Sequence, residues 1–470
     1  MTIRRVFAPR IDFSALRREL ELPTEFPPAA QREAEEAARP ATPSTGNDRT
    51  AIPFVTIDPA TSRDLDQAVC LERRDGGFRV YYAIADVAAV VRPGGPLEAE
   101  TWKRGQTIYL PDGKVPLHPP VLSEGAASLL PDEDRAAVLW TIDLDASGTT
   151  TAVHVERATV RSRAKLDYDG VQSDVDAGRL HPSIALLPEI GRLLVGHALE
   201  RGAIDLPMPE QEVEPDGSGW KLTLRAPALV EEWNAQISLL TGMAAARIML
   251  DGGIGLLRTM PPPPPESIAR LKGAARALGI PWPHGASAGS VLASVNPAEP
   301  HAAAFIDQAA ELMRGAGYTA FAGSPPEQPL HGAVAAPYAH VTAPLRRLAD
   351  RYATEACLAL TAGLNVPDWV RQALPKLPDV MSTTDRTAGA AARGAVDLTE
   401  AMLLKDRVGE EFDAAVVDVG NNHHKGGAVA ITDPPVRARC EGDDLPLGER
   451  IRVRLIEADP DKRKVLFRAG

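Results

Sequence analysis

Residues 51–68, AIPFVTIDPATSRDLDQA, combine an apolar run with three closely spaced aspartates. The run Ile52–Ile57 predicts a buried strand, and the turn-forming residues after Asp58 predict a loop. In the next extended segment, alternation places Asp64 and Asp66 on the same side of the chain. Carboxylates held together in a partly dry site repel one another unless a cation neutralises them. The pattern indicates a metal site, where hard oxygen ligands favour magnesium or manganese over zinc, or else a turn whose aspartates cap their own backbone.

The overall composition is that of an ordinary globular protein. With 470 residues, 44% hydrophobic and 24% charged, the chain is long enough for about three domains. Its net charge of −12 argues against a surface coated in positive charge, so an anionic substrate would need a locally basic groove. The cysteines are far apart, which fits a reducing compartment without disulfides. Because we find no signal peptide or membrane-length apolar window, we expect a cytoplasmic protein without a membrane partner.

The chain predicts an α+β multidomain protein. Residues 1–48 are expected to form a small helical N-terminal domain, which is either a helix-turn-helix-like module that touches nucleic acid or a plain packing segment. A linker rich in Pro, Ser and Thr at residues 40–50 marks its boundary. Over residues 406–470, short alternating strands separated by turn residues predict an OB-type barrel.

Several elements follow from local patterns. A strong hairpin signal joins the strands Ala68–Arg73 and Phe78–Ala85 through an Asp-Gly-Gly turn. Periodicity predicts a helix at Pro227–Leu250 with a core-facing stripe that consists of Leu229, Trp233, Ile237 and Leu240. The other predicted helices are Phe13–Leu20, Pro28–Ala38, Ile184–Leu199, Ser267–Leu278 and His301–Arg314.

A basic segment with an aromatic residue lies between residues 102 and 120. Lys103, Arg104 and Lys114 are interleaved there with Tyr109 among short extended pieces and prolines. Such a combination suits contact with a phosphate backbone and stacking on a base. The alternative is a tyrosine that is buried in a loop.

A second informative segment contains two consecutive arginines. The pattern predicts that Thr342 caps a helix beginning near Pro344, so that Arg346 and Arg347 fall in its first turn. The helix dipole disfavours cations there unless an anion is bound, and free amides with a guanidinium would form a phosphate cradle. The alternative is a simple ion pair between Arg346 and Asp350, one turn further on.

The C-terminal barrel carries basic residues of its own. Its last third is rich in arginine, with Arg450, Arg452 and Arg454 as candidate nucleic-acid contacts. The adjacent pair His423 and His424 could touch phosphate, but it fits a solvated hairpin loop better and is a weak metal signal without further ligands.

Taken together, these segments resemble the ribonuclease II and ribonuclease R family of exoribonucleases, whose catalytic unit is the RNB domain. The resemblance covers residues 50–405 and is most specific in three motifs that follow the family's order and spacing. They are TIDPATSRDLDQA (56–68), AIADVAAVVRPGGPLEAETWKRGQTIYLP (83–111) and YAHVTAPLRR (338–347). The resemblance implies an RNB catalytic domain over residues 49–405, with a mixed sheet surrounded by helices. The barrel is similar to S1-type RNA-binding domains.

The resemblance also implies an activity. Enzymes of the family take RNA 3′ end first into a channel and hydrolyse it stepwise and processively to nucleoside 5′-monophosphates with Mg²⁺, for which Mn²⁺ could substitute. By position, Asp58, Asp64 and Asp66 would hold metal. Asp66 would be indispensable, and Asp64 would also be catalytic. Arg346 would clamp the scissile phosphate, and Tyr109 would stack on the terminal base. Lys103, Arg104, Arg347, Arg450, Arg452 and Arg454 would contact RNA.

The chain departs from the family pattern at three places. Gln67 stands where the family has a fourth aspartate, so it could coordinate metal through its carbonyl but brings no charge. Ala392 stands near the position of a glutamate in a late helix. The residues before the RNB domain are too few for two cold-shock barrels of about 70 residues each. Easier access is therefore expected for structured RNA with a 3′ overhang.

We therefore expect a monomeric, processive 3′-to-5′ exoribonuclease that acts in RNA degradation or processing. The alternative is a catalytically weakened RNB-fold protein that binds RNA without cleaving it. A DNA exonuclease is left open as well, because contacts to the ribose 2′-hydroxyl cannot be located in the sequence.

Overall fold

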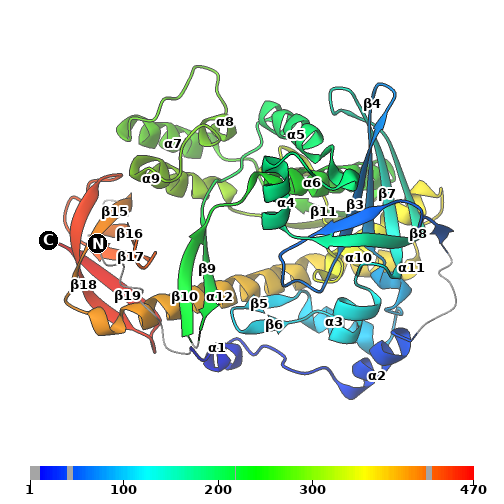
Figure 1. Ribbon diagram of the computed structural model, residues 1–470, viewed down its shortest axis with the longest axis horizontal. Helices are drawn as coiled ribbons and strands as arrows, with labels where there is room; N and C mark the ends of the chain where they lie inside the picture. Colours follow the sequence, from blue (N-terminus) through cyan, green and yellow to red (C-terminus); the bar gives the residue numbers. More distant parts are fainter. Residues whose placement is uncertain (1–10, 40–45, 218, 420–425) are drawn as a thin grey trace.

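The computed structural model describes residues 11–39, 46–217, 219–419 and 426–470. The pair His423 and His424 therefore lies outside the described residues. In Figure 1, a large α+β body stands at one end, the C-terminal barrel stands at the other, and the long helix α12 (Leu377–Leu404) runs between them. The α+β class expected from the sequence is confirmed. Within the described ranges, no helix combines the length and the apolar composition needed to cross a bilayer.

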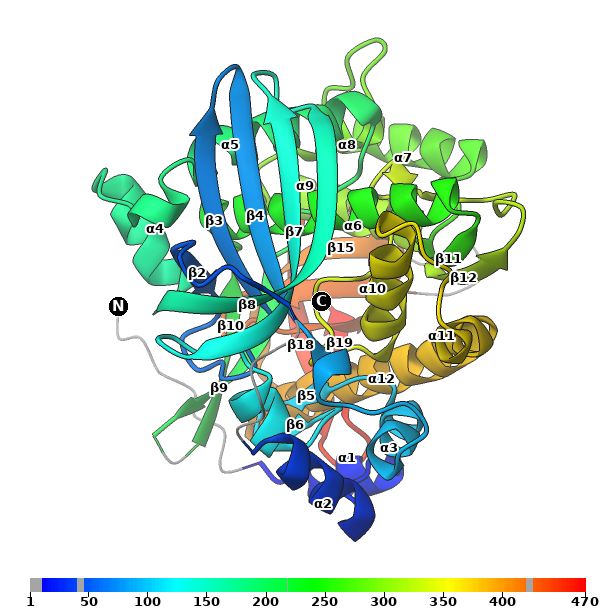
Figure 2. The same ribbon diagram turned by 90° about the vertical axis from the view of Figure 1, so that its right-hand side faces the viewer.

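One curled sheet forms the centre of the large body. Its strand order is β1-β8-β2-β3-β4-β7, and β7 also pairs with β8, so the strands curl round on themselves (Figure 2). Strands β1 and β2 run parallel to β8, whereas the other pairs are antiparallel, so the expected mixed sheet is present. The strands are β1 (Asn47–Asp48), β2 (Phe54–Ile57), β3 (Gln67–Arg74), β4 (Gly77–Ala85), β7 (Asp134–Asp145) and β8 (Thr150–Leu166).

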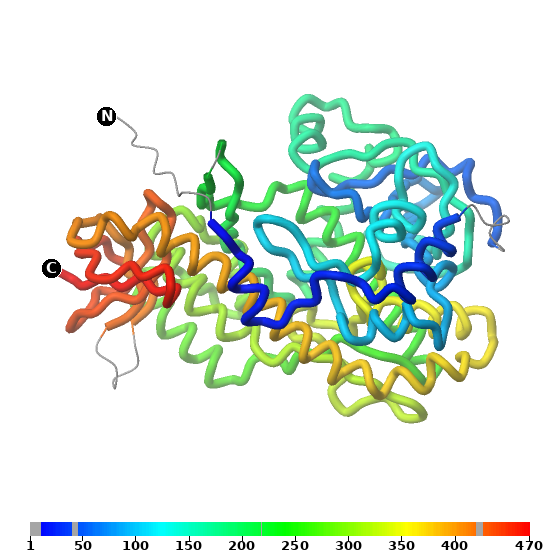
Figure 3. Tube along the Cα trace, turned by 90° about the horizontal axis from the view of Figure 1, so that it is seen from below, coloured from blue at the N-terminus to red at the C-terminus, as the bar shows by residue number. Residues whose placement is uncertain are grey.

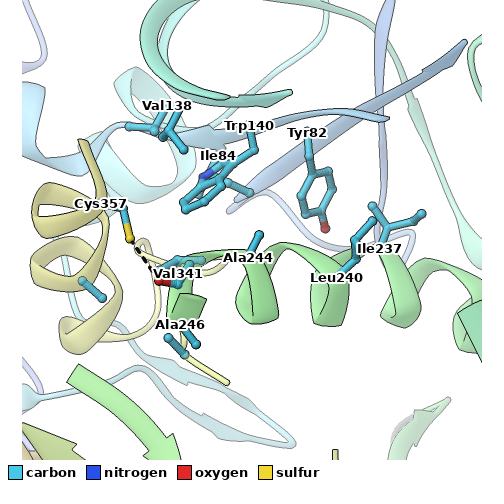
Figure 4. Close-up of a cluster of buried hydrophobic side chains, with 14 of the residues drawn as sticks. Tyr82, Ile84, Val138, Trp140, Ile237, Leu240, Ala244, Ala246, Val341 and Cys357 are labelled. Atoms are coloured by element: carbon cyan, nitrogen blue, oxygen red, sulfur yellow. Dashed lines mark hydrogen bonds between the residues drawn. The ribbon is translucent and has the colours of Figure 1, made fainter. Parts of the chain in front are cut away.

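The sheet is buried on both faces because side chains alternate along its strands. On β4, Tyr82 and Ile84 enter one buried apolar cluster, and Ala83 enters another. Figure 4 shows the first cluster, where the strand side chains meet helix α6 (Leu229–Asp251) and helix α10 (Leu348–Thr361). The two helices thus hold this face of the sheet in place.

Most elements predicted from local patterns are present. The β3–β4 hairpin turns at Gly76, whose positive φ of 79° suits glycine. The core stripe on α6 is confirmed for Trp233, Ile237 and Leu240, but it is wrong for Leu229, which begins the helix and is 56% exposed. The further elements of this body are α3 (Pro96–Arg104), β5 (Ile108–Leu110), β6 (Gly113–Val115), α4 (Tyr168–Asp176), α5 (Leu187–Arg201), β9 (Glu210–Asp216), β10 (Gly219–Arg225), β11 (Ile254–Thr259), α7 (Pro265–Ala277), α8 (Ala288–Leu292), α9 (Pro300–Ala309), β12 (Gly317–Ala322), β13 (Leu330–His331), β14 (Ala336–Pro337) and α11 (Asp368–Ala373).

Helix α10 begins at Leu348 and not near Pro344 as predicted. Residues 342–347 form a loop, so the paired arginines do not lie in a first helical turn. The carboxylate of Asp350 shapes this loop, because it accepts hydrogen bonds from a backbone amide within it, at 2.7 Å, and from the guanidinium of Arg347, at 3.0 Å. A side chain inside the helix thus delays the start of the helix.

The C-terminal region forms the predicted closed five-stranded barrel, with strand order β15-β16-β17-β19-β18. Phe412, Val453 and Phe467 are among the buried residues that fill it. The strands are β15 (Glu411–Val419), β16 (Gly427–Ile431), β17 (Arg437–Glu441), β18 (Arg450–Asp459) and β19 (Lys464–Ala469). Their positions agree closely with the alternation in the sequence.

The N-terminal helices α1 (Ser14–Glu19) and α2 (Pro28–Ala37) form as predicted. They do not share a core of their own, because Leu16 lies in the cluster that links α12 with the barrel, whereas Ala30 and Ala34 lie against the sheet. Figure 3 shows this segment running along the body beside α12. In the described residues, the packing of these helices therefore agrees with the packing-segment alternative and not with a separate helix-turn-helix-like domain.

Candidate active site

The acidic loop between β2 and β3 is anchored by Leu65, which is fully buried. The Leu65 amide donates a hydrogen bond of 3.0 Å to the hydroxyl of Ser128, and that hydroxyl donates to the Arg63 carbonyl at 2.6 Å. The aspartates at positions 64 and 66 flank this anchor. Because side chains alternate along an extended chain, both carboxylates turn away from the core that holds the leucine.

Asp66 is the more buried of the two, at 4% exposure. One carboxylate oxygen accepts a hydrogen bond of 2.7 Å from the Leu345 amide, and the other lies 3.6 Å from Nε of Arg346. Burial raises the pKa of Asp66 to about 7, although the guanidinium of Arg346 opposes that shift. The loop before α10 and the acidic loop thus meet face to face.

The other two aspartates, Asp58 and Asp64, interact electrostatically with the groups of this pair. Burial raises the pKa of Asp58 to about 6; Arg346 counteracts the rise, and the charge of Asp64 adds to it. Asp64 itself forms an ion pair of 2.8 Å with Lys114 and accepts a hydrogen bond of 3.2 Å from the hydroxyl of Tyr109. The three predicted carboxylates and Arg346 therefore share one site.

The chemistry of this site fits a hard divalent cation. All three carboxylates offer oxygen ligands, which Mg²⁺ and Mn²⁺ prefer. Burial raises the pKa values of Asp58 and Asp66 above the ordinary range of a carboxyl, and an added cation would favour the ionised carboxylates. Among the residues that the structure describes, no group of three or more histidine, cysteine, aspartate or glutamate side chains is arranged so that it could hold a metal ion.

Gln67 has a different role from the metal ligand expected from the sequence. Its Nε2 donates to the Thr342 carbonyl at 2.6 Å, and its Oε1 accepts a hydrogen bond of 2.6 Å from the hydroxyl of Tyr82. The amide is therefore engaged at both ends and ties the start of β3 to the loop before α10. The other departure, Ala392, is exposed on α12.

The paired arginines are divided between two roles. Arg347 forms two hydrogen bonds of 3.0 Å with the carboxylate of Asp350, so the predicted RNA contact at Arg347 is replaced by an internal ion pair. The ion pair that the sequence offered as an alternative for Arg346 is thus made by its neighbour. Arg346 remains 47% exposed, and its carbonyl accepts a hydrogen bond of 2.9 Å from the amide of Thr107. Its side chain can therefore face a substrate.

The prediction of an RNA contact at Arg104 is wrong. Its side chain is buried, forms an ion pair of 2.9 Å with Glu100, and donates to the carbonyls of Glu25 and Pro116. The helix α3 turns this position inward, toward the N-terminal segment. Lys103, one residue earlier, is exposed and has only a 3.6 Å contact with Glu100.

Tyr109 is 50% exposed, so the alternative of a tyrosine buried in a loop is wrong. It lies on β5 opposite Lys114 of β6. Since both side chains reach Asp64, this short hairpin forms one wall of the site. A ring that is half exposed beside the carboxylates is available for stacking.

The barrel arginines are exposed, but most of their charge is paired. Arg452 lies 3.2 Å from Asp413, and Arg454 lies 2.9 Å from Glu411, across the β15–β18 register. They line a hollow of about 280 Å³ on the barrel surface. Arg450 is exposed on the same strand. The sequence located these arginines but not the carboxylates opposite them, because the strand register sets that pairing.

His118 supports the site and was missed by the sequence analysis. It is buried, and its Nδ1 lies 3.0 Å from the carbonyl of Leu345, whose amide holds Asp66. Burial lowers the pKa of His118 to about 4, so the ring is neutral at pH 7 and can donate to this carbonyl. The only signal in the sequence was a lone histidine among prolines.

Comparison with known proteins gives matches over both parts of the chain. The RNB domain matches residues 47–360, and the C-terminal S1 domain of RNase II-type exonucleases matches residues 410–470. Ribonuclease R of Escherichia coli is 28% identical over 88% of this chain and 56% of its own length. An exosome complex exonuclease RRP44 homolog A of Arabidopsis thaliana is 29% identical over 78% of this chain and 41% of its own length. The chain thus spans about half the length of these curated relatives.

Solved structures show the same fold. A Mycoplasma genitalium RNase R in complex with ribose-methylated single-stranded RNA superimposes with a TM-score of 0.84 at 21% identity, over 97% of this chain and 77% of that one. Yeast Ssd1, a pseudonuclease, reaches a TM-score of 0.68 at 16% identity, over 95% of this chain and 53% of that one. The fold therefore occurs both in nucleases and in a protein without nuclease activity.

Proposed function

Because the chain belongs to the RNB domain family, we propose that it is a processive 3′-to-5′ exoribonuclease that hydrolyses RNA to nucleoside 5′-monophosphates by metal-assisted in-line attack. We further propose that it acts as a monomer in RNA degradation or processing. The observation that carries the proposal is the 3.6 Å approach of Arg346 to the buried carboxylate of Asp66. A cation and a cluster of acids face each other there across a partly open site, as phosphodiester hydrolysis requires.

A divalent metal is part of this proposal, and Mg²⁺ is the ion we propose, with Mn²⁺ as a substitute. Asp58, Asp64 and Asp66 would hold it, since their oxygens are hard ligands and a cation would offset the rise that burial causes in the pKa values of Asp58 and Asp66. When bound, such a metal supplies an activated water and stabilises the leaving 3′ oxygen. Gln67 would act by fixing the position of the strand that follows Asp66.

The remaining groups would bind and orient the RNA. Arg346 would offset the charge that gathers on the phosphate oxygens during attack, because its exposed guanidinium is held beside the carboxylates by the loop backbone. Tyr109 would stack on the terminal base, and the barrel arginines would add weak contacts to the phosphate backbone. We propose that structured RNA with a 3′ overhang is also a substrate. A solved relative is an RNase R in complex with double-stranded RNA.

A weakened protein that binds RNA without cleaving it is the second candidate, and one observation favours it. Gln67 brings no charge, and its amide oxygen is engaged by Tyr82. Against it, the three aspartates and Arg346 are still held together. The fold does not separate the two candidates, so a direct assay must.

The test is a time course on a single-stranded oligoribonucleotide, labelled at its 5′ end in one sample and uniformly in a second, with and without Mg²⁺. We expect release of nucleoside 5′-monophosphates only with the metal, and loss of full-length RNA directly to a short remnant without long intermediates. The matching deoxy-oligonucleotide tests the choice of RNA over DNA. RNA binding without any monophosphate would favour the second candidate, and internal fragments would contradict the exonuclease proposal.

A further inference from the structure

The hairpin β5–β6 has one face in the site and one in a core. Tyr109 and Lys114 are cross-strand partners, and both reach Asp64. On the opposite face, Ile108 and Val115 are buried. Because the hairpin has only two short strands, its own hydrogen bonds cannot hold it rigidly, so its position depends on what lies under the buried face.

Two segments lie against that face, namely helix α12 and the N-terminal segment, residues 11–26. Phe13, Leu16 and Leu22 share one buried cluster with the inward side chains of the hairpin. Phe13 also packs edge to face against Trp220 of β10, with ring centroids 5.7 Å apart. We refer to residues 11–26 as the strap.

A bidentate ion pair joins the strap to the turn of the hairpin. Arg17 of α1 donates from both terminal nitrogens to the carboxylate of Asp112, at 2.8 and 2.6 Å. The pair is only partly exposed, with 19% of the arginine and 31% of the aspartate side chain accessible. Two parallel hydrogen bonds fix orientation as well as distance. The turn between Tyr109 and Lys114 is therefore tied to α1.

The far end of the strap is fixed as well. The buried guanidinium of Arg104 donates to the carbonyl of Glu25 at 2.6 Å and lies 3.7 Å from the ring centroid of Phe26. In the middle of the strap, at the end of α1, Glu19 pairs with Arg463 of the barrel at 2.7 Å. The strap is thus a braced element between the barrel and the root of the hairpin, as its course in Figure 3 shows.

We propose that the strap, through Arg17 and Asp112, positions Tyr109 over the acidic site and thereby sets the length of the RNA remnant at which digestion stops. This inference rests on the proposed function. Short RNAs make few contacts, so a well-placed stacking ring matters most to them. With the turn released, short substrates should dissociate earlier, whereas long RNAs keep their other contacts. Arg17 and Asp112 are positioning residues and do not touch the substrate.

The test compares Arg17→Ala and Asp112→Asn with Arg18→Ala. Arg18 lies beside Arg17 on α1, and its guanidinium donates to the hydroxyl of Ser14 in the same helix at 3.3 Å, so it is a matched control. For Arg17→Ala and Asp112→Asn we expect a longer remnant and a KM for short oligoribonucleotides that is about tenfold higher, with kcat on long RNA unchanged. The charge swap Arg17→Asp with Asp112→Arg should restore the wild-type remnant. Arg18→Ala should behave as wild type.

The outcomes are distinct. Wild-type release of monophosphates together with an unchanged remnant in both variants would overturn the inference alone. A longer remnant that the charge swap does not shorten would also overturn it, because the ion pair would then not be the cause. Absence of monophosphate release by the wild type would instead contradict the proposed function. If Arg17→Ala melts below the assay temperature, the nearly isosteric Asp112→Asn decides the question.

Discussion

Arg346 and the arginines of β18 are the same type of residue in two very different settings. Arg346 stands in a loop whose backbone is held by the neighbouring hairpin, and it faces the buried Asp66 at 3.6 Å. Arg452 and Arg454 project from a barrel strand, are 60% and 61% exposed, and pair with surface carboxylates. The first is fixed where charge is poorly screened, and the others lie in solvent.

This difference decides what each arginine can do. A charge beside a buried carboxylate is screened less by water than a charge in a fully exposed ion pair, which water and salt both weaken. A guanidinium that is fixed in advance can stabilise a transition state without reorganising. The exposed arginines can exchange their carboxylate partners for phosphates, which favours binding more than chemistry. Substitutions at the two places should therefore have effects of different kind and size.

The largest effect is expected for Asp66→Asn. The amide keeps the shape and can still accept the hydrogen bond from Leu345, but the charge is lost. We expect single-turnover cleavage to fall by about 10³-fold or more, while RNA binding by fluorescence anisotropy is retained. Asp75→Asn, in the exposed turn of the β3–β4 hairpin, is the control and should cleave normally. Near-normal hydrolysis by Asp66→Asn would refute the role assigned to this carboxylate.

The next largest effects are expected for the paired arginines, and they differ in kind. Arg346→Gln should lower kcat by about 10²- to 10³-fold, with little change in melting temperature, because an exposed charge at the site is removed. Arg347→Gln should instead lower the melting temperature, because the fully buried Asp350 loses its partner at a cost of about 3–5 kcal/mol. Steady-state kinetics and thermal melts measure both. Equal melting temperatures for the two variants would show that the division of roles is wrong.

Local patterns were enough for much of the fold. The β3–β4 hairpin and the five barrel strands follow from alternation and turn residues, whose physics is local. The start of α10 could not be found this way. The start of the helix depends on the carboxylate of Asp350, which lies inside the helix and holds the preceding loop. Local helix propensity does not predict such a contact. The course of the N-terminal segment depends likewise on which cores α1 and α2 meet.

The site was predictable only in part, for the same reason. The acidic loop is visible as a motif, but its meeting with Arg346 brings together residues far apart in the sequence, and only the family resemblance indicated it. The composition of a segment also does not show which way each side chain points. Arg104 and Lys103 are neighbours on α3, yet one is buried under the strap and the other lies in solvent. The role of Gln67 depends on a tyrosine of the adjacent strand.

On the barrel, the double change Arg452→Gln with Arg454→Gln should act on affinity alone. We expect KM for long RNA to rise by about three- to tenfold at low salt, with kcat unchanged. If both side chains contact phosphates, the slope of log affinity against log salt should become shallower by about 1.4 for single-stranded RNA. Arg179→Gln, an exposed arginine on the far side of α4 that pairs with Asp174, is the control. A fall in kcat would contradict the contrast drawn with Arg346.

A buried carboxyl at the junction of the barrel and α12 provides the smallest test. Glu400 is 4% exposed and accepts hydrogen bonds from Gln211, at 2.9 Å, and from the amide of Arg437, at 3.1 Å. Burial raises its pKa to about 7 despite these donors. It thus resembles Asp66 in its pKa, but the guanidinium near it, that of Arg437, forms an ion pair with Asp307 at 2.5 Å. Because Glu400 lies outside the proposed active site, its ionisation should affect stability and not chemistry.

The direction of the pH effect on stability follows from the raised pKa of Glu400. Between the ordinary pKa of 4.5 and the folded value of about 7, the folded state binds more protons than the unfolded state, so the free energy of unfolding falls as pH rises through this window. In Glu400→Gln this contribution is absent, and the variant should gain about 1–3 kcal/mol relative to wild type between pH 5 and pH 8. Denaturant unfolding at the two pH values measures it, with Glu327→Gln in an exposed loop as the control. Because Asp66 is unchanged in both proteins, the difference isolates the barrel junction, and kcat at pH 8 should stay the same. A parallel pH dependence of the two stabilities would mean that Glu400 is ionised within the folded junction.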